Sequence, residues 1–252
     1  MPNAHLSLGI AQLILYIPIV PLAIFLAWRN RSGKPRMAWF SLSPFGLMRF
    51  AGGIITILYQ NSPSTGLFIA DLVLLNVGTI PLIVVDAGCT GTMCFKDAPF
   101  AARVQKALRV AFIAAASLLS AGAAVSGTSS RGLTRSLTLA GYAVFSATLV
   151  ALMVAQLLLL LLTERPQMDR GSRKILYSAL AASPFLVVRN VYGLLEVGFE
   201  LDADSVWNPV TGSARKFAVM ALLMEYIAVM PFLYAGFSVH PARDARPNSY
   251  GL

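Results

Sequence analysis

Long runs of apolar residues, each of about twenty positions or more, limit most strongly what this chain can fold into. An α-helix rises about 1.5 Å per residue, so about 20 residues cross a hydrocarbon core of about 30 Å. Inside lipid every backbone N–H and C=O must be bonded, and a helix satisfies them within one segment. The runs therefore predict an all-α, polytopic membrane protein.

Seven such runs follow one another, separated by short connections. The predicted spans are Leu6–Trp28, Met37–Gln60, Gly66–Ala87, Val104–Val125, Leu133–Thr163, Ile175–Phe199 and Phe217–Val239. The connections contain Pro, Gly, Asn and Ser, which end helices and form turns. We therefore predict a seven-transmembrane helix bundle that forms one membrane domain over residues 1–252, with 240–252 as a flexible cytosolic tail.

Charged residues are scarce and unevenly placed. They make up 12% of the chain, whereas a soluble domain has about 25%. Fourteen Lys and Arg residues flank the predicted spans on one side and four on the other. Cytosolic loops retain basic residues, so we predict the N-terminus outside or in the lumen and the C-terminus in the cytosol. The same bias accounts for the net charge of +9.

Composition disfavours several classes of partner and cofactor. No polar stretch interleaves basic and aromatic residues, so we expect no nucleic-acid partner. The only cysteines are Cys89 and Cys94, and the only histidines are His5 and His240, one near each terminus. We therefore predict neither a metal site nor a cofactor. The expected environment is a lipid bilayer, of the endoplasmic reticulum or the plasma membrane, and the oligomeric state stays open.

Two of the predicted spans carry the same motif. The pattern S-P-F-x-x-x-R-x-x-x-G runs from Ser43 to Gly53 and again from Ser183 to Gly193, 140 residues later. Arginine is rare inside membranes, so the coincidence favours a duplication of spans one to three as spans five to seven. A single connecting span gives both copies the same orientation, which makes a 3+1+3 parallel repeat. The alternative is two unrelated helices, because proline is common in membrane spans.

The spans contain a small set of polar groups that hydrocarbon disfavours. An ionisable side chain at the centre of a span costs about 2.5–3.5 kcal/mol on insertion scales, so it faces the bundle interior. The ionisable residues are Arg49, Asp71, Arg189, Glu196 and Glu225, and the polar residues beside them include Tyr59, Asn76, Asn190, Tyr192 and Tyr226. By helix rise, the ionisable groups converge on the outer half of the bundle. Asp86 is expected to be hydrated near the cytosolic end of the third span.

These groups indicate either a structural or a chemical role. We predict two ion pairs, Arg49 with Asp71 and Arg189 with Glu225, one in each copy. Under the structural interpretation the pairs only hold helices in register. Under the functional interpretation they belong to a polar pocket reached from the outer leaflet, where a carboxyl group donates a proton or anchors a ligand. A carboxylate held by arginine stays ionised and an unpaired buried one stays protonated, and the sequence leaves open which acid is unpaired.

The functional interpretation gives each group a role. The candidate catalytic residues are Glu225 and Asp71, and the candidate substrate-binding residues are Arg49, Arg189, Tyr192, Glu196, Asn76, Asn190 and Tyr226. Arg189, Tyr192 and Glu196 fall on one helical face by their spacing of three and seven residues. This interpretation predicts that Glu225→Gln abolishes activity while the protein still folds.

One stretch resembles a known group of proteins. Ser183-Pro-Phe-Leu-Val-Val-Arg-Asn-Val-Tyr192, together with Trp207-Asn208 and Met224-Glu225, is similar to a large group of uncharacterised fungal seven-span membrane proteins. The resemblance implies the fold and the membrane location, and it suggests a role in the pathway of a lipophilic secondary metabolite. In architecture alone the chain is also similar to fungal membrane-bound terpene cyclases, whose acid-bearing motifs it lacks.

Three functions agree with this design. The first expectation is an intramembrane cyclase or isomerase for a lipophilic small molecule, which needs one protonated acid, an apolar cavity and no cofactor. A small-molecule transporter or exporter agrees with the parallel repeat, and Pro44, Pro81, Pro184 and Pro231 would serve as its hinges. A seven-span receptor agrees with the topology, but its short cytosolic loops offer little surface to a G protein. The seventh span has no central Lys for a retinal pigment.

Overall fold

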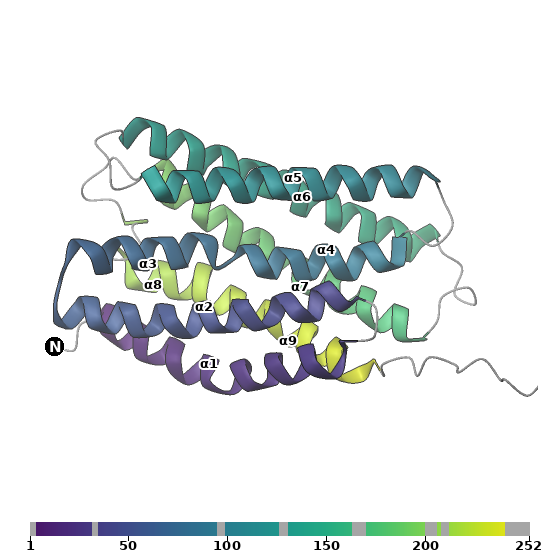
Figure 1. Cartoon of the computed structure of the whole chain (residues 1–252), viewed down its shortest axis with the longest axis horizontal. Coiled ribbons are helices and arrows are strands. Elements are labelled where there is room, and N and C mark those ends of the chain that lie inside the picture. Colours follow the sequence, from purple (N-terminus) through teal and green to yellow (C-terminus); the bar gives the residue numbers. More distant parts are fainter. Residues whose placement is uncertain are drawn as a thin grey trace, which may run out of the picture.

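The computed structural model describes residues 4–31, 35–94, 99–125, 131–162, 170–199, 206–207 and 212–239, and every regular element in these ranges is helical. The elements are α1 (Ala4–Arg29), α2 (Arg36–Asn61), α3 (Thr65–Val77), α4 (Ile80–Cys94), α5 (Pro99–Val125), α6 (Arg131–Leu162), α7 (Arg170–Gly198), α8 (Ala214–Phe217), the π-helical η1 (Ala218–Leu223) and α9 (Met224–Ser238). They run along the long axis of one elongated bundle (Figure 1). The predicted tail, 240–252, lies outside the described residues.

In the described part of the chain, six helical segments are long and apolar enough to cross a membrane. They are Ala4–Arg29, Arg36–Asn61, Thr65–Gly91, Gly132–Leu161, Gly171–Gly198 and Ala214–Ser238. Each contains one predicted span or most of it, so the apolar runs located these helices correctly. The prediction of an all-α, multi-pass membrane protein is confirmed for the described part of the chain.

The remaining predicted span, 104–125, lies in α5 and is less clearly a membrane helix. Among its described residues, α5 contains the apolar stretch Val110–Gly122, and Arg103, Lys106 and Arg109 precede this stretch. A stretch of this length is shorter than the roughly 20 residues that a span needs. A seventh span and the orientation that follows from it therefore stay predictions.

The outer helices lie on opposite sides of a central group. α1 packs against α2 and α9, and α6 packs against α5, α7 and α4. In Figure 1, α5 and α6 lie along one side of the bundle, α1 lies along the other, and the α3–α4 rod and α2 lie between them. The fully buried core between the helices includes the aromatic side chains of Tyr16, Trp39, Phe45, Phe145 and Phe232.

The surface of the bundle carries many large apolar side chains. Ile14, Ile17 and Leu161 each expose more than half of their surface. Water would penalise such a surface, whereas hydrocarbon tails match it. The bilayer is therefore the environment that this surface fits.

We call each helical segment that runs the length of the bundle a rod. The third rod, which consists of α3 and α4, is broken at its centre. α3 ends at Val77 and α4 begins at Ile80, so Gly78 and Thr79 lie between two half-helices. Pro81 has no N–H to donate to the carbonyl of Val77, four residues earlier, which explains why the hydrogen bonding of the helix is interrupted here. The predicted span 66–87 was continuous. The break leaves backbone carbonyl groups without helical N–H donors in the buried middle of the bundle.

The last rod is irregular as well. Between α8 and α9 the backbone forms the π-helical segment η1, and Glu225 follows one residue after the start of α9. π-Helical segments are rare and are frequent at functional sites. The two irregular rods carry residues that meet in the site described below.

Candidate functional site

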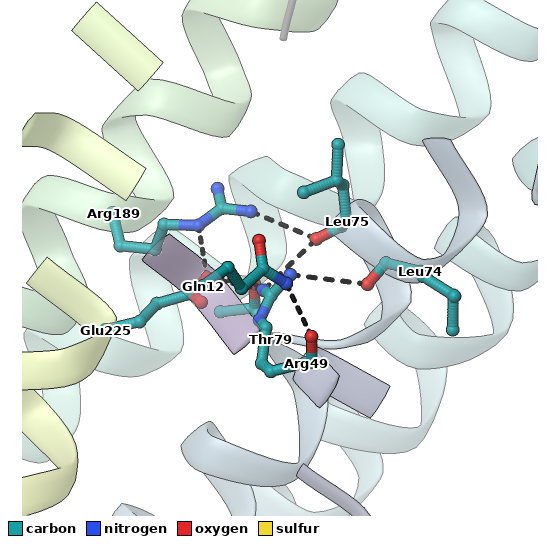
Figure 2. Close-up of polar contacts among 7 residues, drawn as sticks. All are labelled: Gln12, Arg49, Leu74, Leu75, Thr79, Arg189 and Glu225. Atoms are coloured by element: carbon teal, nitrogen blue, oxygen red, sulfur yellow. Dashed lines mark hydrogen bonds and ion pairs between the residues drawn. The ribbon is translucent and has the colours of Figure 1, made fainter. Parts of the chain in front are cut away.

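Two arginines from different helices share one carboxylate in the bundle interior (Figure 2). Nη2 of Arg49 on α2 and Nε of Arg189 on α7 each lie 2.5 Å from Oε1 of Glu225 on α9. The hydroxyl of Thr79, at the helix break, donates to the same oxygen at 3.2 Å. We call Arg49, Arg189 and Glu225 the Arg–Glu–Arg cluster.

The helix break supplies further acceptors to the two arginines. Arg189 Nη2 donates to the carbonyl of Leu75 at 3.0 Å, and Arg49 Nη2 donates to the same carbonyl at 3.4 Å. Arg49 Nη1 also reaches the carbonyl of Leu74 at 3.5 Å. Carbonyls in the last turn of a helix carry partial negative charge, so cations are stabilised there. The arginines therefore cap the broken end of α3.

Other polar groups fix the position of Arg49. Gln12 on α1 donates from Nε2 to the backbone carbonyl of Arg49 at 2.6 Å. Arg49 Nη2 also donates to the hydroxyl of Thr79 at 3.1 Å. Because Thr79 both accepts from Arg49 and donates to Glu225, the break is tied to α2 and α9 through one hydroxyl.

The cluster is almost completely shielded from solvent. Arg49, Arg189, Glu225 and Thr79 are between 1% and 3% exposed. Removing one member of a buried ion pair costs about 3–5 kcal/mol, because it leaves an uncompensated charge. Within the cluster two cations contact one anion, and Nε of Arg49 is buried without a hydrogen-bond partner among the described residues. The cluster thus has donor capacity beyond what Glu225 uses.

One of the two predicted ion pairs is confirmed and the other is wrong. Arg189 pairs with Glu225 as predicted, but Arg49 pairs with Glu225 too. Asp71 accepts a hydrogen bond from the hydroxyl of Thr56 at 2.9 Å and makes no ion pair among the described residues. Asp71 is 2% exposed, so it is a buried carboxyl group that no cation of the described residues contacts directly.

The antiparallel register of α2 and α3 explains this difference. Arg49 lies at the level of the break, since a Cβ on Gly78 would come within 3.2 Å of its Cζ. Thr56 follows Arg49 by seven residues on α2, and Asp71 precedes Gly78 by seven residues on α3. Because the two helices are antiparallel, both steps lead away from the break in the same direction. Seven residues span about 10 Å of helix, so Asp71 faces Thr56 and lies beyond the reach of Arg49.

Two predicted binding residues face other partners. The hydroxyl of Tyr192 donates to the carbonyl of Trp207 at 3.1 Å, and its ring packs against the Trp207 ring. Asn190 donates to the carbonyl of Tyr142 at 3.1 Å and to the hydroxyl of Ser146 at 2.5 Å. Asn190 therefore joins α7 to α6, whereas Tyr192 lies at the end of the bundle where the chain returns towards α8.

Two further predicted binding residues, Glu196 and Tyr226, lie outside the cluster. Glu196 is 7% exposed and lies almost two turns beyond Arg189 on α7. Tyr226, the neighbour of Glu225, packs partly buried against the main core. The side chain of Asn76 lies outside the described residues. Of the nine predicted site residues, the structure brings Arg49, Arg189 and Glu225 into direct contact.

Sequence reasoning missed a second buried polar group. Asp86 was expected to be hydrated, but it is 0% exposed, because α4 continues for two more turns to Cys94. It contacts Gln156 on α6 and Ser183 on α7. The signals were available: Gln156 stands just before a run of leucines, and Ser183 opens the second copy of the repeated motif.

The fold and the site define a class: a multi-pass helical membrane protein whose broken third rod holds a buried Arg–Glu–Arg cluster. The family model for DUF7702, described as a domain of unknown function, matches residues 3–242, so the chain belongs to this family. Among curated proteins and among solved structures, none matches the chain.

Proposed function

We propose that this protein is a membrane carrier for a small lipophilic molecule with an anionic group, which Arg49 and Arg189 bind. The observation that carries the proposal is the convergence of two buried guanidinium groups, from α2 and α7, on one carboxylate beside a helix break. Guanidinium groups bind carboxylates and phosphates through paired N–H donors. A ligand of this class would compete with Glu225 for the arginines.

The repeated motif supports a carrier built from two similar halves. In both copies the glycine lies against the preceding rod. A Cβ on Gly53 would meet Leu13 on α1 at 3.0 Å, and a Cβ on Gly193 would meet Tyr142 on α6 at 2.3 Å. Both motif arginines bind the same carboxylate, that of Glu225. Corresponding residues thus make corresponding contacts, which favours the predicted 3+1+3 repeat with α5 as the connector.

The packing of the outer helices supports the same interpretation. α1 contacts α2 and α9, and α6 contacts α7 and α4. If spans one to three correspond to spans five to seven, these two sets of contacts are equivalent. In carriers with internal repeats, binding sites lie between the repeats and are formed by discontinuous helices. Here the break after α3 lies beside Arg189, and the π-helical η1 ends two residues before Glu225.

The bonding of Glu225 makes the carrier a better proposal than a cyclase that uses this residue. One oxygen of Glu225 accepts from two guanidinium groups and a hydroxyl. This arrangement binds the carboxylate anion, whereas a general acid must carry a proton. Glu225 then acts as an internal anion that holds the two halves together until a ligand replaces it on one arginine.

A transport assay with matched probes tests the proposal. The purified protein would be placed in lipid vesicles and offered pyrenesulfonate, a lipophilic anion, or pyrenemethylammonium, which has the same ring system and a positive charge. We expect uptake of the anion above that of protein-free vesicles. Arg189→Gln should lower it by about 10- to 100-fold, since a charge-assisted hydrogen bond contributes about 1.5–3 kcal/mol.

The control variant is Arg215→Gln, which removes an exposed arginine ten residues before Glu225 and outside the cluster. It should leave uptake of pyrenesulfonate unchanged. Equal uptake of the anion and the cation, or uptake no greater than in protein-free vesicles, would show that the two arginines do not form an anion site for transport.

An acid-catalysed cyclase or isomerase is the second candidate, and Asp71 is the observation in its favour. This carboxyl group is 2% exposed and accepts from the hydroxyl of Thr56. Organic extracts of the native host, with and without the gene, separate the two candidates. Accumulation of an isomer of equal mass would support the enzyme. An unchanged product that shifts between cells and medium would support the carrier.

A further inference from the structure

A second polar group lies in the bundle interior and has no role in the proposed anion site. Gln156 on α6 donates from Nε2 to Asp86 Oδ1 at 2.9 Å and to the hydroxyl of Thr90 at 2.8 Å. Ser183 on α7 lies 2.8 Å from Gln156 Oε1 and 3.4 Å from Asp86 Oδ2. We call Asp86, Thr90, Gln156 and Ser183 the Asp86 network. Its members are at most 1% exposed.

No counter-charge contacts Asp86 in the part of the chain that the structure describes. Among the described residues it makes no ion pair, and its side-chain partners are an amide and a hydroxyl. An isolated carboxylate in such a place costs several kcal/mol of desolvation that neutral donors offset only in part. The Arg–Glu–Arg cluster is different, because guanidinium groups neutralise Glu225 there.

The protons of the Asp86 network can be counted. Both hydrogens of the Gln156 amide are used, one on Asp86 and one on Thr90. Thr90 donates its hydroxyl to the backbone carbonyl of Asp86 at 2.9 Å. Ser183 has one proton, and its nearer acceptors are Gln156 Oε1 at 2.8 Å and the Ala179 carbonyl at 2.9 Å. Asp86 Oδ2 therefore lacks a donor unless it carries its own proton.

We propose that Asp86 is a proton-binding site, which holds its proton on Oδ2 and donates it to Ser183 Oγ. With this proton every donor in the network has an acceptor, and no charge is left in the apolar interior. Loss of the proton to water leaves the carboxylate, which needs a wetter environment. Release therefore requires α4 to separate from α7, at the end of the bundle where α4 ends at Cys94.

The site is placed so that proton release can move one half-helix. Ser183 and Arg189 lie six residues apart on α7. Arg189 binds α3 through the Leu75 carbonyl, and Ser183 binds α4 through Asp86, with the helix break between the two contacts. A proton at Asp86 thus controls the contact of α4 with α7. This coupling rests on the proposed carrier function, whereas the proton site itself does not.

The charged and titratable groups nearby belong to other contacts. On α4 itself, Cys89 is buried one turn after Asp86. α6 and α7 contribute Gln156 and Ser183, which do not titrate. From α2, Arg49 is bound to Glu225, and on α5 the side chain of Lys106 is exposed. Among the described residues, Asp86 is therefore the carboxyl group that titrates in this network.

Infrared spectroscopy of the purified protein near neutral pH tests the site directly, using the carbonyl stretch of a protonated carboxylic acid. We expect this band in the natural protein and its loss in Asp86→Asn. The variant should fold, because its amide donates to Ser183 and accepts from Gln156 as the neutral acid does. The matched control, Asp71→Asn, should leave the Asp86 band in place.

A second variant keeps the test decisive if Asp86→Asn fails to fold. Ser183→Ala removes the acceptor of the proposed proton, so the band should remain and move to the position of a less strongly bonded acid. A spectrum without the band in the natural protein, or a band that both Asp86→Asn and Ser183→Ala leave unchanged, would overturn the proton site.

Vesicle uptake then separates the site from the carrier function. Asp86→Asn fixes the neutral form, so uptake of pyrenesulfonate should fall and lose its response to an imposed pH gradient. If the Asp86 band is present and no anion is taken up, the proton site stands and the carrier proposal fails. If the anion is taken up with the same pH response in both proteins, the coupling to Asp86 is wrong.

Discussion

At the scale of single residues, Glu225 determines how two buried cations are tolerated. Its Oε1 is the shared acceptor of Arg49, Arg189 and Thr79. Each guanidinium also uses carbonyls at the break, so the carboxylate and the helix end neutralise the arginines together. The same geometry agrees with a cluster that only holds the helices together and with a site where the anionic group of a ligand replaces Glu225. Only changes to single groups can separate these two roles.

Glu225→Gln should destabilise the protein strongly. The amide leaves two buried guanidinium groups without an anion, and breaking a buried ion pair costs about 3–5 kcal/mol. Chemical unfolding in detergent measures the loss. Asp71→Asn is the control, because the hydrogen bond of Asp71 among the described residues comes from the neutral Thr56 hydroxyl, and it should cost about 1 kcal/mol or less. If Glu225→Gln cost no more than Asp71→Asn, the ion pairs would not stabilise the fold.

Arg189→Lys separates charge from geometry. Lysine keeps the positive charge but lacks the planar set of donors that reaches both Glu225 and the Leu75 carbonyl. We expect a loss of about 1–3 kcal/mol in the free energy of unfolding. We also expect pyrenesulfonate uptake to stay above that of Arg189→Gln. Equal uptake by the two variants would mean that the charge at this position does not matter for binding.

At the scale of elements, the break between α3 and α4 is the feature around which the site is built. The two half-helices contact α7 through different residues, and the carbonyls freed by the break receive the arginines. Gly78 makes this possible by its small size: a Cβ there would meet the Leu74 carbonyl oxygen at 2.4 Å and Arg49 Cζ at 3.2 Å. The need for glycine is therefore one of space.

Gly78→Ala should destabilise the protein by about 1–3 kcal/mol, because the added methyl group overpacks the break. Gly66→Ala is the matched control, since nothing lies within 4 Å of the place where its Cβ would be. Gly66 lies in the first turn of α3, and alanine there should be neutral or slightly stabilising. Thermal unfolding of both variants checks the contrast, and similar melting temperatures would contradict the close packing at Gly78.

At the scale of the whole molecule, the number of spans decides where the two termini lie. Among the described residues, six helical segments qualify by length and composition, and α5 contributes the shorter apolar stretch Val110–Gly122. With α5 as a span there are seven crossings and the termini lie on opposite sides of the membrane. With α5 on the membrane surface there are six, and both termini lie on one side.

An epitope tag at each terminus distinguishes these topologies. We expect a tag before Met1 to be accessible on the outer or lumenal side and a tag after Leu252 to be accessible only from the cytosol, as the basic residues predict. Antibody labelling before and after selective permeabilisation measures this. Labelling of both tags from the same side would show that α5 does not cross the membrane.

The apolar runs predicted the fold well, because the need to bury backbone polar groups in lipid leaves few alternatives to helices. The contacts between helices were harder to predict. Arg49 was paired with Asp71 because depth alone was considered, whereas the register of α2 and α3 places Asp71 opposite Thr56. The sequence predicts a hydrated Asp86 because the predicted span ends at Ala87, whereas α4 continues to Cys94. The first error concerns the register of two helices and the second the end of one helix, and composition encodes neither.

The shared carboxylate also has a consequence for how the protein is made. Glu225 lies 176 residues after Arg49 in the chain. During synthesis Arg49 enters the membrane long before its anion exists, and an unpaired arginine at the centre of a span costs about 2.5–3.5 kcal/mol on insertion scales. The first helices must therefore stay loosely inserted or be held by the insertion machinery. Assembly of the interior is completed only when the last helix arrives, and a chain truncated before it should be degraded.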